Sequence, residues 1–180
     1  PGARNCTIAD NVIEGTTRWT QEALGPSGKN IGEGIQMTGP GNVICFNRVT
    51  GFRDNISTLE DQGAADQFCV DIYNNDIYEA ADDGIEADFC FHNCRVMRNR
   101  ITNGYTGLSS QPGLGGPTYF VRNVMYNLTS KPYKAMRGSA GDVYLHNTVV
   151  KGGDGACAAS KGWVHSLLRN NLAIGGPGLG

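Results

Sequence analysis

Polar positions interrupt the apolar stretches of this chain in one recurring order. An apolar residue is followed by two residues of any type, an asparagine, one further residue and a second apolar residue, as in Tyr144-x-x-Asn147-x-Val149. Asparagine is disfavoured inside strands because its amide competes with the backbone for hydrogen bonds. The unit nevertheless occurs seven times, around Asn11, Asn47, Asn75, Asn99, Asn123, Asn147 and Asn170.

The spacing of these asparagines indicates a repeat architecture. They are separated by 36, 28, 24, 24, 24 and 23 residues, and a near-constant period is typical of stacked repeats. Apolar residues do not recur three and four positions apart over any long window, so amphipathic helices are excluded. A period of about 24 residues fits one turn made of three short strands and three bends. We therefore predict an all-β fold, a single-stranded parallel β-helix (solenoid) of about seven turns.

The repeated asparagine has a structural explanation in such a coil. We expect it at the same bend of every turn, in the left-handed backbone conformation that Asn tolerates. Because successive turns lie about 4.8 Å apart, each amide can hydrogen-bond to the amides above and below, as in the Asn ladders of stacked sheets. The flanking apolar residues would point into the core.

This unit resembles the repeat of the right-handed parallel β-helix superfamily, which includes pectate lyases, polygalacturonases, alginate epimerases and phage tailspikes. The segments "DDGIE", "GGPTYFVRNVMYN" and "HNTVV" are similar to those of a bacterial group of secreted β-helix repeat proteins. The resemblance implies a right-handed winding, a carbohydrate-related function and a secreted or cell-surface location. The Gly-His-Gly and Arg-Ile-Lys motifs of polygalacturonases and the Tyr-Gly-x-Asp-Pro-His-Asp motif of alginate epimerases are absent, so neither activity can be carried over residue by residue.

The two longer intervals predict where the coil carries insertions. The first interval exceeds the period by about a dozen residues, which we assign to a loop at 18–30, and the second has a smaller excess near 53–66. Insertions at the bends of a solenoid often shape one binding face. Nothing marks a domain boundary, so we expect one β-helix domain over residues 1–180. Because the last repeat is incomplete, we expect this domain to be a segment of a longer protein.

Composition excludes several classes of partner. The net charge is -2 and the basic residues are scattered, so we expect no nucleic acid. No stretch approaches the roughly 20 apolar residues that cross a bilayer, so we expect no membrane insertion. The sequence predicts no particular oligomeric state. The six cysteines allow either buried thiols or disulfides, and Cys90-x-x-x-Cys94 lacks a partner pair at zinc spacing.

Stacking also predicts which outward side chains lie together. The residues eleven positions after three successive asparagines form one column, with its ends roughly 10 Å apart: Glu86, Ser110 and Lys134. Gln111 and Arg137 follow closely in the chain. The stretch around Glu86 adds three further carboxylates: Asp82, Asp83 and Asp88.

An acidic cluster beside Lys134 and Arg137 suits elimination on an acidic sugar. We assign Lys134 as base and Arg137 as the group that steers the uronate, with Asp83 and Glu86 binding a cation or the sugar. Ser110 and Gln111 would contact the substrate. The hard oxygen ligands that suit Ca²⁺ would come from Asp82, Asp83, Glu86 and Asp88.

Three other interpretations of these residues stay open. Asp83 and Glu86 could be the acid and the base or nucleophile of a glycoside hydrolase. The same face could bind a polysaccharide without turnover, as in an adhesin. "ADDG" could also be an ordinary solvated turn. Tyr105 and Trp163 could stack on sugar rings or pack against the core.

A second column lies directly before the asparagines. It contains four basic residues: Arg98, Arg122, His146 and Arg169. This stripe could hold an anionic polymer, with Arg98 and Arg122 as substrate-binding residues, or it could be a solvated edge. The sequence as a whole favours a polysaccharide lyase-like protein that acts on an acidic polysaccharide.

Overall fold

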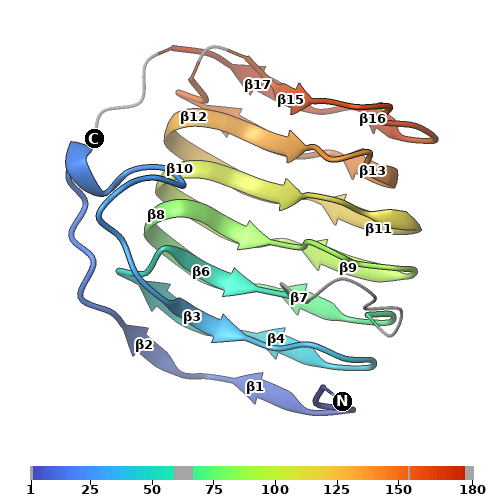
Figure 1. The fold of residues 1–180 in the computed structure, drawn as a ribbon, viewed down its shortest axis with the longest axis horizontal. Coiled ribbons are helices and arrows are strands. Elements are labelled where there is room, and N and C mark those ends of the chain that lie inside the picture. Colours follow the sequence, from blue (N-terminus) through green and yellow to red (C-terminus); the bar gives the residue numbers. More distant parts are fainter. Residues whose placement is uncertain (1, 59–66, 154, 177–180) are drawn as a thin grey trace.

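The chain forms a parallel β-solenoid in the computed structural model, which describes residues 2–58, 67–153 and 155–176. The turns lie one above another in chain order, from β1 and β2 at one end to β16 and β17 at the other (Figure 1). The solenoid has about six turns between the seven levels of its first sheet. In the described residues, the only helix is the three-residue η1 (Gln21–Ala23), and no helix is long and apolar enough to cross a membrane.

Two parallel sheets make up the wall of the solenoid. The seven strands of the first are β1 (Thr7–Ala9), β4 (Val43–Cys45), β7 (Asp71–Tyr73), β9 (Cys94–Met97), β11 (Leu114–Val121), β13 (Ala140–Leu145) and β16 (Leu167–Arg169). The second follows the asparagine corner and contains β2 (Val12–Glu14), β5 (Arg48–Thr50), β8 (Asp76–Glu86), β10 (Arg100–Ser110), β12 (Val124–Ala135), β14 (Thr148–Val150) and β17 (Leu172–Ile174).

The long strands β8, β10 and β12 bend, and their distal halves form a third face. Three shorter strands extend that face at its ends: β3 (Glu33–Gln36), β6 (Asp54–Ser57) and β15 (Cys157–Ala159). Each turn therefore contributes three strand segments, as the period of the sequence predicts.

Inward side chains of equivalent positions stack on each other to form the core. One stack comes from each face: Ile44, Ile72, Val96, Phe120 and Tyr144; Val49, Ile77, Ile101, Met125 and Val149; Ile56, Ile85, Leu108 and Tyr133. The rings of Phe120 and Tyr144 are nearly parallel, with centroids 4.6 Å apart. Since each such burial contributes about 1.5–3 kcal/mol, these stacks are the main source of stability.

The asparagine side chains form a continuous chain of hydrogen bonds along one corner. Each Nδ2 donates to Oδ1 of the asparagine in the next turn, over 2.9–3.1 Å, from Asn11 to Asn171. Each Oδ1 also accepts the backbone N–H of the preceding asparagine, as between Asn75 and Asn99 (3.0 Å). The polar groups of the corner are thereby satisfied although most of these asparagines are buried.

Two details of this corner differ from the sequence prediction. The last member of the chain is Asn171 and not Asn170, because Tyr144 pairs with Leu168 and the final interval is 24 residues. The left-handed conformation belongs to the residue before each asparagine. These residues have φ between 54° and 61°: Asp10, Phe46, Asn74, Arg98, Arg122, His146 and Asn170.

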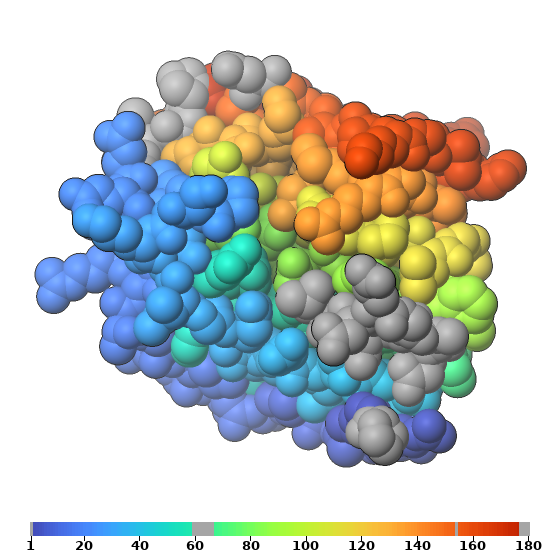
Figure 2. All heavy atoms as spheres, in the orientation of Figure 1, coloured from blue at the N-terminus to red at the C-terminus, as the bar shows by residue number. Residues whose placement is uncertain are grey.

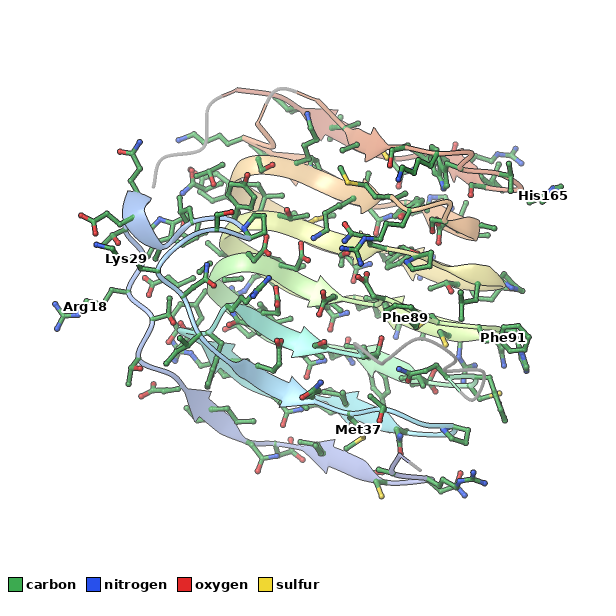
Figure 3. All side chains as sticks on the ribbon, in the orientation of Figure 1. Arg18, Lys29, Met37, Phe89, Phe91 and His165 are labelled. Atoms are coloured by element: carbon green, nitrogen blue, oxygen red, sulfur yellow. The ribbon has the colours of Figure 1, made fainter. Side chains whose placement is uncertain are left out.

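Residues 18–30 leave the coil between β2 and β3, as their excess length predicts. The loop climbs past later turns (Figures 1 and 2), and Gly25 N–H donates to the carbonyl of Ala81 in β8 (2.7 Å). Gly25 has φ +84°, and a Cβ there would lie 3.0 Å from the ring of Tyr105 in β10. A glycine is therefore required where the loop touches the third face.

The expected second insertion, 53–66, is only partly a loop. Asp54–Ser57 is strand β6, and Ile56 belongs to the core. The excess residues therefore follow Ser57, and 59–66 lie outside the described residues. All six cysteines are free thiols, three of them buried: Cys45, Cys90 and Cys94. Of the two alternatives, free thiols and disulfides, the structure has free thiols.

Candidate functional site

The predicted acidic and basic residues meet in one cleft on the third face. The cleft has a volume of about 440 Å³ and lies over the distal halves of β8, β10 and β12, with Pro26 of the long loop at its edge. Three residues from β8 and the turn after it form an acidic wall: Asp82, Glu86 and Asp88. Three from β12 and the turn after it form a basic wall: Lys131, Lys134 and Arg137. Between the two walls, Tyr105 and Thr106 lie on β10, and Gln111 follows that strand.

Strand pairing sets Glu86 and Lys134 in one column, as predicted, but with a different residue between them. Glu86 pairs with Ser109, and Ser109 pairs with Lys134. Between Gly104 and Thr106 strand β10 has one residue fewer than its neighbours, which shifts its register by one. Two strand spacings, roughly 10 Å, separate the backbones of Glu86 and Lys134, and the side chain of Lys134 reaches back across β10 to Asp83.

Ser110, the residue expected in this column, lies elsewhere. It is fully buried, and its Oγ donates to Oδ1 of Asp142 at 2.7 Å. Asp142 also accepts hydrogen bonds from Ser139 (2.7 Å) and from Nε1 of Trp163 (2.9 Å). Ser110 and Trp163 therefore belong to a buried network that holds the chain after β12, and neither lines the cleft.

Asp83 lies beneath the cleft, where it forms an ion pair with Lys134. The side chains are 1% and 17% exposed, and Lys134 Nζ donates to Asp83 Oδ2. Burial alone lowers the pKa of Lys134, but the charge and hydrogen bond of Asp83 outweigh it and the net pKa is raised. Lys134 is therefore held as a cation at neutral pH.

A group of buried carboxyls extends from Asp83 toward the first turns. Asp54 Oδ1 accepts the backbone N–H of Asp83 at 2.7 Å. Burial first, and then the charge of Asp83, raises the pKa of Asp54 to about 10, while burial raises the pKa of Asp83 itself to about 7. Glu33, which pairs with Asp54 in the sheet, has its pKa raised to about 7 by burial and by the charge of Glu86.

Two sets of these carboxyls are close enough to share a metal ion. One oxygen from each of Asp54, Asp82 and Asp83 lies within 4.8 Å of the others, and the same holds for Glu33, Asp54 and Glu86. Asp88, which we expected among the ligands, belongs to neither set. Its Oδ1 instead accepts hydrogen bonds from Ser109 Oγ and from the backbone N–H of Gln111, both at 2.7 Å.

The remaining predicted residues fall into two groups. Arg137 and Gln111 line the cleft. Arg98 and Arg122 occupy the left-handed positions of the asparagine corner and are exposed there, apart from the cleft. Arg169 does not belong to the basic stripe, because Asn170 occupies the position that Arg98 and Arg122 hold in their turns.

Sequence reasoning missed several residues of the site. Arg53 and Lys131 line the cleft, and Asp54 and Glu33 complete the carboxyl group. Glu33 follows the inserted loop at 18–30, so counting from Asn11 does not place it. Asp54 precedes the excess residues of its turn and lies seven positions after Asn47, so counting could have placed it. The strands that carry these two acids, β3 ("EGIQ") and β6 ("DNIS"), each have an acid two residues before an inward isoleucine. This shared pattern could have revealed that Glu33 and Asp54 lie in one column.

The fold and this site define a parallel β-solenoid with a charged cleft on its third face. Neither a protein-family model, nor a curated protein, nor a solved structure matches the chain. The functional argument accordingly rests on the cleft.

Proposed function

We propose that the cleft binds an acidic polysaccharide, a polymer of uronic acid residues, and cleaves it by β-elimination. The observation that carries the proposal is the column that places Glu86 and Lys134 on either side of Ser109, with both side chains lining the cleft. A carboxylate and a cation that line the same cleft are the two groups that removal of a proton next to a carboxylate requires. As part of the same proposal, the protein acts outside the cell, as a secreted or cell-surface protein.

In this proposal Lys134 and Arg137 bind the uronate carboxylate. Lys134 keeps its proton because Asp83 raises its pKa, so it stabilises negative charge rather than taking a proton. Charge accumulates on the substrate carboxylate as the neighbouring C5–H bond breaks, and fixed cations lower the energy of that state. This assignment replaces the role of base that the sequence suggested for Lys134.

Glu86 is the proposed base. It lines the cleft, and Ser57 Oγ donates to its Oε2 at 2.7 Å, which fixes its orientation. Glu86 takes the C5 proton, the electron pair forms the C4=C5 double bond, and the C4–O bond breaks. The leaving oxygen takes a proton from water. The products are a new chain end and an unsaturated uronate.

Glycoside hydrolysis by Asp83 and Glu86 has less support. Asp83 is 1% exposed and its Oδ2 is bound by Lys134, so it does not face a substrate in the cleft. Binding without turnover would use the same cations and is separated from elimination by the experiment below.

The test uses a panel of uronate polymers and follows the ultraviolet absorbance of the unsaturated product. Glu86→Gln is expected to lower turnover by about 10²-fold or more while binding persists, as expected for loss of a general base. Lys134→Met is expected to weaken both binding and turnover. Arg98→Asn is the matched control, because Asn74 and Asn170 hold the equivalent left-handed position in other turns.

Three outcomes would overturn the proposal. Release of reducing ends without the absorbance would indicate hydrolysis. Binding without either product would indicate a non-catalytic module. Full activity of Glu86→Gln would remove the proposed base.

A further inference from the structure

We propose that Asp54, Asp82 and Asp83 bind one calcium ion beneath the floor of the cleft. The three side chains come from β6 and β8, which are neighbours in the sheet. Each offers one carboxylate oxygen, and these oxygens lie within 4.8 Å of one another. Oxygens at such separations can all reach one Ca²⁺ at its usual distance of about 2.3–2.6 Å.

Two oxygens in this group are buried and accept no hydrogen bond. They are Asp82 Oδ1 and Asp83 Oδ1, on side chains that are 5% and 1% exposed. Buried polar atoms almost always have a partner, because desolvation without one is unfavourable. Asp82 and Asp83 therefore each have a buried oxygen that is free to bind a cation.

The charges around the group also favour a cation. Five acidic side chains gather here: Glu33, Asp54, Asp82, Asp83 and Glu86. Two cations face them. Lys134 is bound to Asp83, and the guanidinium of Arg53 lies 3.5 Å from Asp54 Oδ2 and 3.7 Å from Asp82 Oδ2. Buried charge of one sign is unfavourable unless it is paired, and one divalent ion would neutralise most of the excess.

The donor set favours calcium over other ions. All the available ligands are carboxylate oxygens, whereas zinc sites usually include His or Cys. Magnesium gives up its water reluctantly and keeps several water ligands, which does not suit a group as buried as this one. Calcium accepts several carboxylates in irregular geometry.

The proposed ion would link adjacent turns. Because the free oxygens of Asp82 and Asp83 are buried, the ion would contact the protein rather than a polysaccharide in the cleft. It would join β6 to β8 and leave Asp83 Oδ2 to hold Lys134. The inference is independent of the proposed function, since it would hold for a cleft that binds no sugar.

The test adds calcium chloride alone to the full chain after treatment with a chelator, with no polysaccharide present. Titration calorimetry is expected to show one site, and thermal unfolding a higher Tm with calcium. Asp54→Asn is expected to weaken binding by roughly tenfold or more, because the number of charged ligands sets calcium affinity. Asp10→Asn is the matched control, since Asp10 is exposed and its φ of 61° suits Asn.

Asp82→Asn gives a second comparison if Asp54→Asn does not fold, because Asp82 Oδ1 accepts no hydrogen bond in the protein. Absence of binding heat and of any Tm change at millimolar calcium would overturn the inference. So would unchanged affinity in both variants, which would put the ion elsewhere. Equal affinity for magnesium would overturn the assignment to calcium. Polysaccharide cleavage is not measured, so failure of the lyase proposal leaves these results intact.

Discussion

Lys134 in β12 and Asp83 in β8 form an ion pair that spans the intervening strand β10. The pair joins two turns that do not touch through their backbones. It also directs the cation of Lys134 along the base of the cleft, next to the site where a substrate carboxylate is proposed to bind. Both stability and the proposed function therefore depend on it.

Loss of this pair is expected to destabilise the solenoid. Lys134→Met leaves Asp83 buried without its cation, which costs about 3–5 kcal/mol for a typical buried pair. The double variant Lys134→Met/Asp83→Asn should recover much of the loss, because no unpaired charge remains. Urea unfolding of the two variants and the wild type measures both effects. A double variant no more stable than Lys134→Met would contradict the account.

The buried carboxyls predict that the protein in chelator loses stability as pH rises. Asp83 and Glu33 have pKa values of about 7 and Asp54 of about 10 in the folded state, all above their values of about 4 in an unfolded chain. Their stabilising effect is therefore complete below pH of about 4 and is lost as pH rises through the folded pKa values. The charged groups that surround these three carboxyls are Arg53, Lys134, Asp82, Glu86 and Asp88.

Thermal unfolding in chelator between pH 5 and 8 checks this expectation. Tm should fall across the range, by about 2–4 °C for each kcal/mol lost in a chain of this size. Calcium should reduce the fall. A Tm that rises with pH in chelator would show that the carboxyls are stabilised in their charged forms.

The asparagine corner predicts a contrast between two neighbouring positions. Asn99→Ala leaves the backbone N–H of Asn75 and the carbonyl of Ile72 without their partners, at a cost of about 1–3 kcal/mol for each buried group. Asn170→Gly should change stability little, because Asn170 is exposed and outside the hydrogen-bonded chain. The denaturant midpoints of the two variants, each compared with that of the wild type, measure this difference in stability. Equal losses would place Asn170 in the chain and contradict the register described above.

The basic stripe predicts a negative result. Arg98→Asn/Arg122→Asn removes two positive charges but keeps residue types that suit φ of 54° and 56°. Because both arginines lie apart from the cleft, affinity for a uronate polymer should stay within about twofold at moderate salt, where distant surface charges are screened. Binding isotherms at two salt concentrations measure this. A large loss would assign the polymer to the corner instead of the cleft.

The fold could be predicted from the sequence because each turn repeats the same local pattern. Asn75, Asn99, Asn123 and Asn147 stand at equal intervals, and pairs such as Ile72 with Val96 follow directly from that spacing. Two registers fit the pattern of the last turn equally well, because Leu167 and Leu168 are both apolar and Asn170 and Asn171 are adjacent. The sequence pattern alone does not select the observed register, in which Tyr144 pairs with Leu168.

The candidate site was only partly predictable because it depends on small departures from the repeat. The shorter segment between Gly104 and Thr106 moves Ser109 into the column and Ser110 into the interior. Glu33 follows the inserted loop at 18–30, where counting from an asparagine fails. The long loop reaches β8 and β10 through Gly25, a contact between distant segments that no local pattern indicates.

The left-handed corner positions have one further consequence. An acid, an aromatic residue, amides, arginines and a histidine all occupy this conformation without altering the turn that contains them. Each side chain points outward and is repeated about every 4.8 Å along the stack. These corner positions can therefore be substituted one at a time without changing the interior. A designed row of like groups there would present a periodic surface, for example to a mineral or to an ordered polymer.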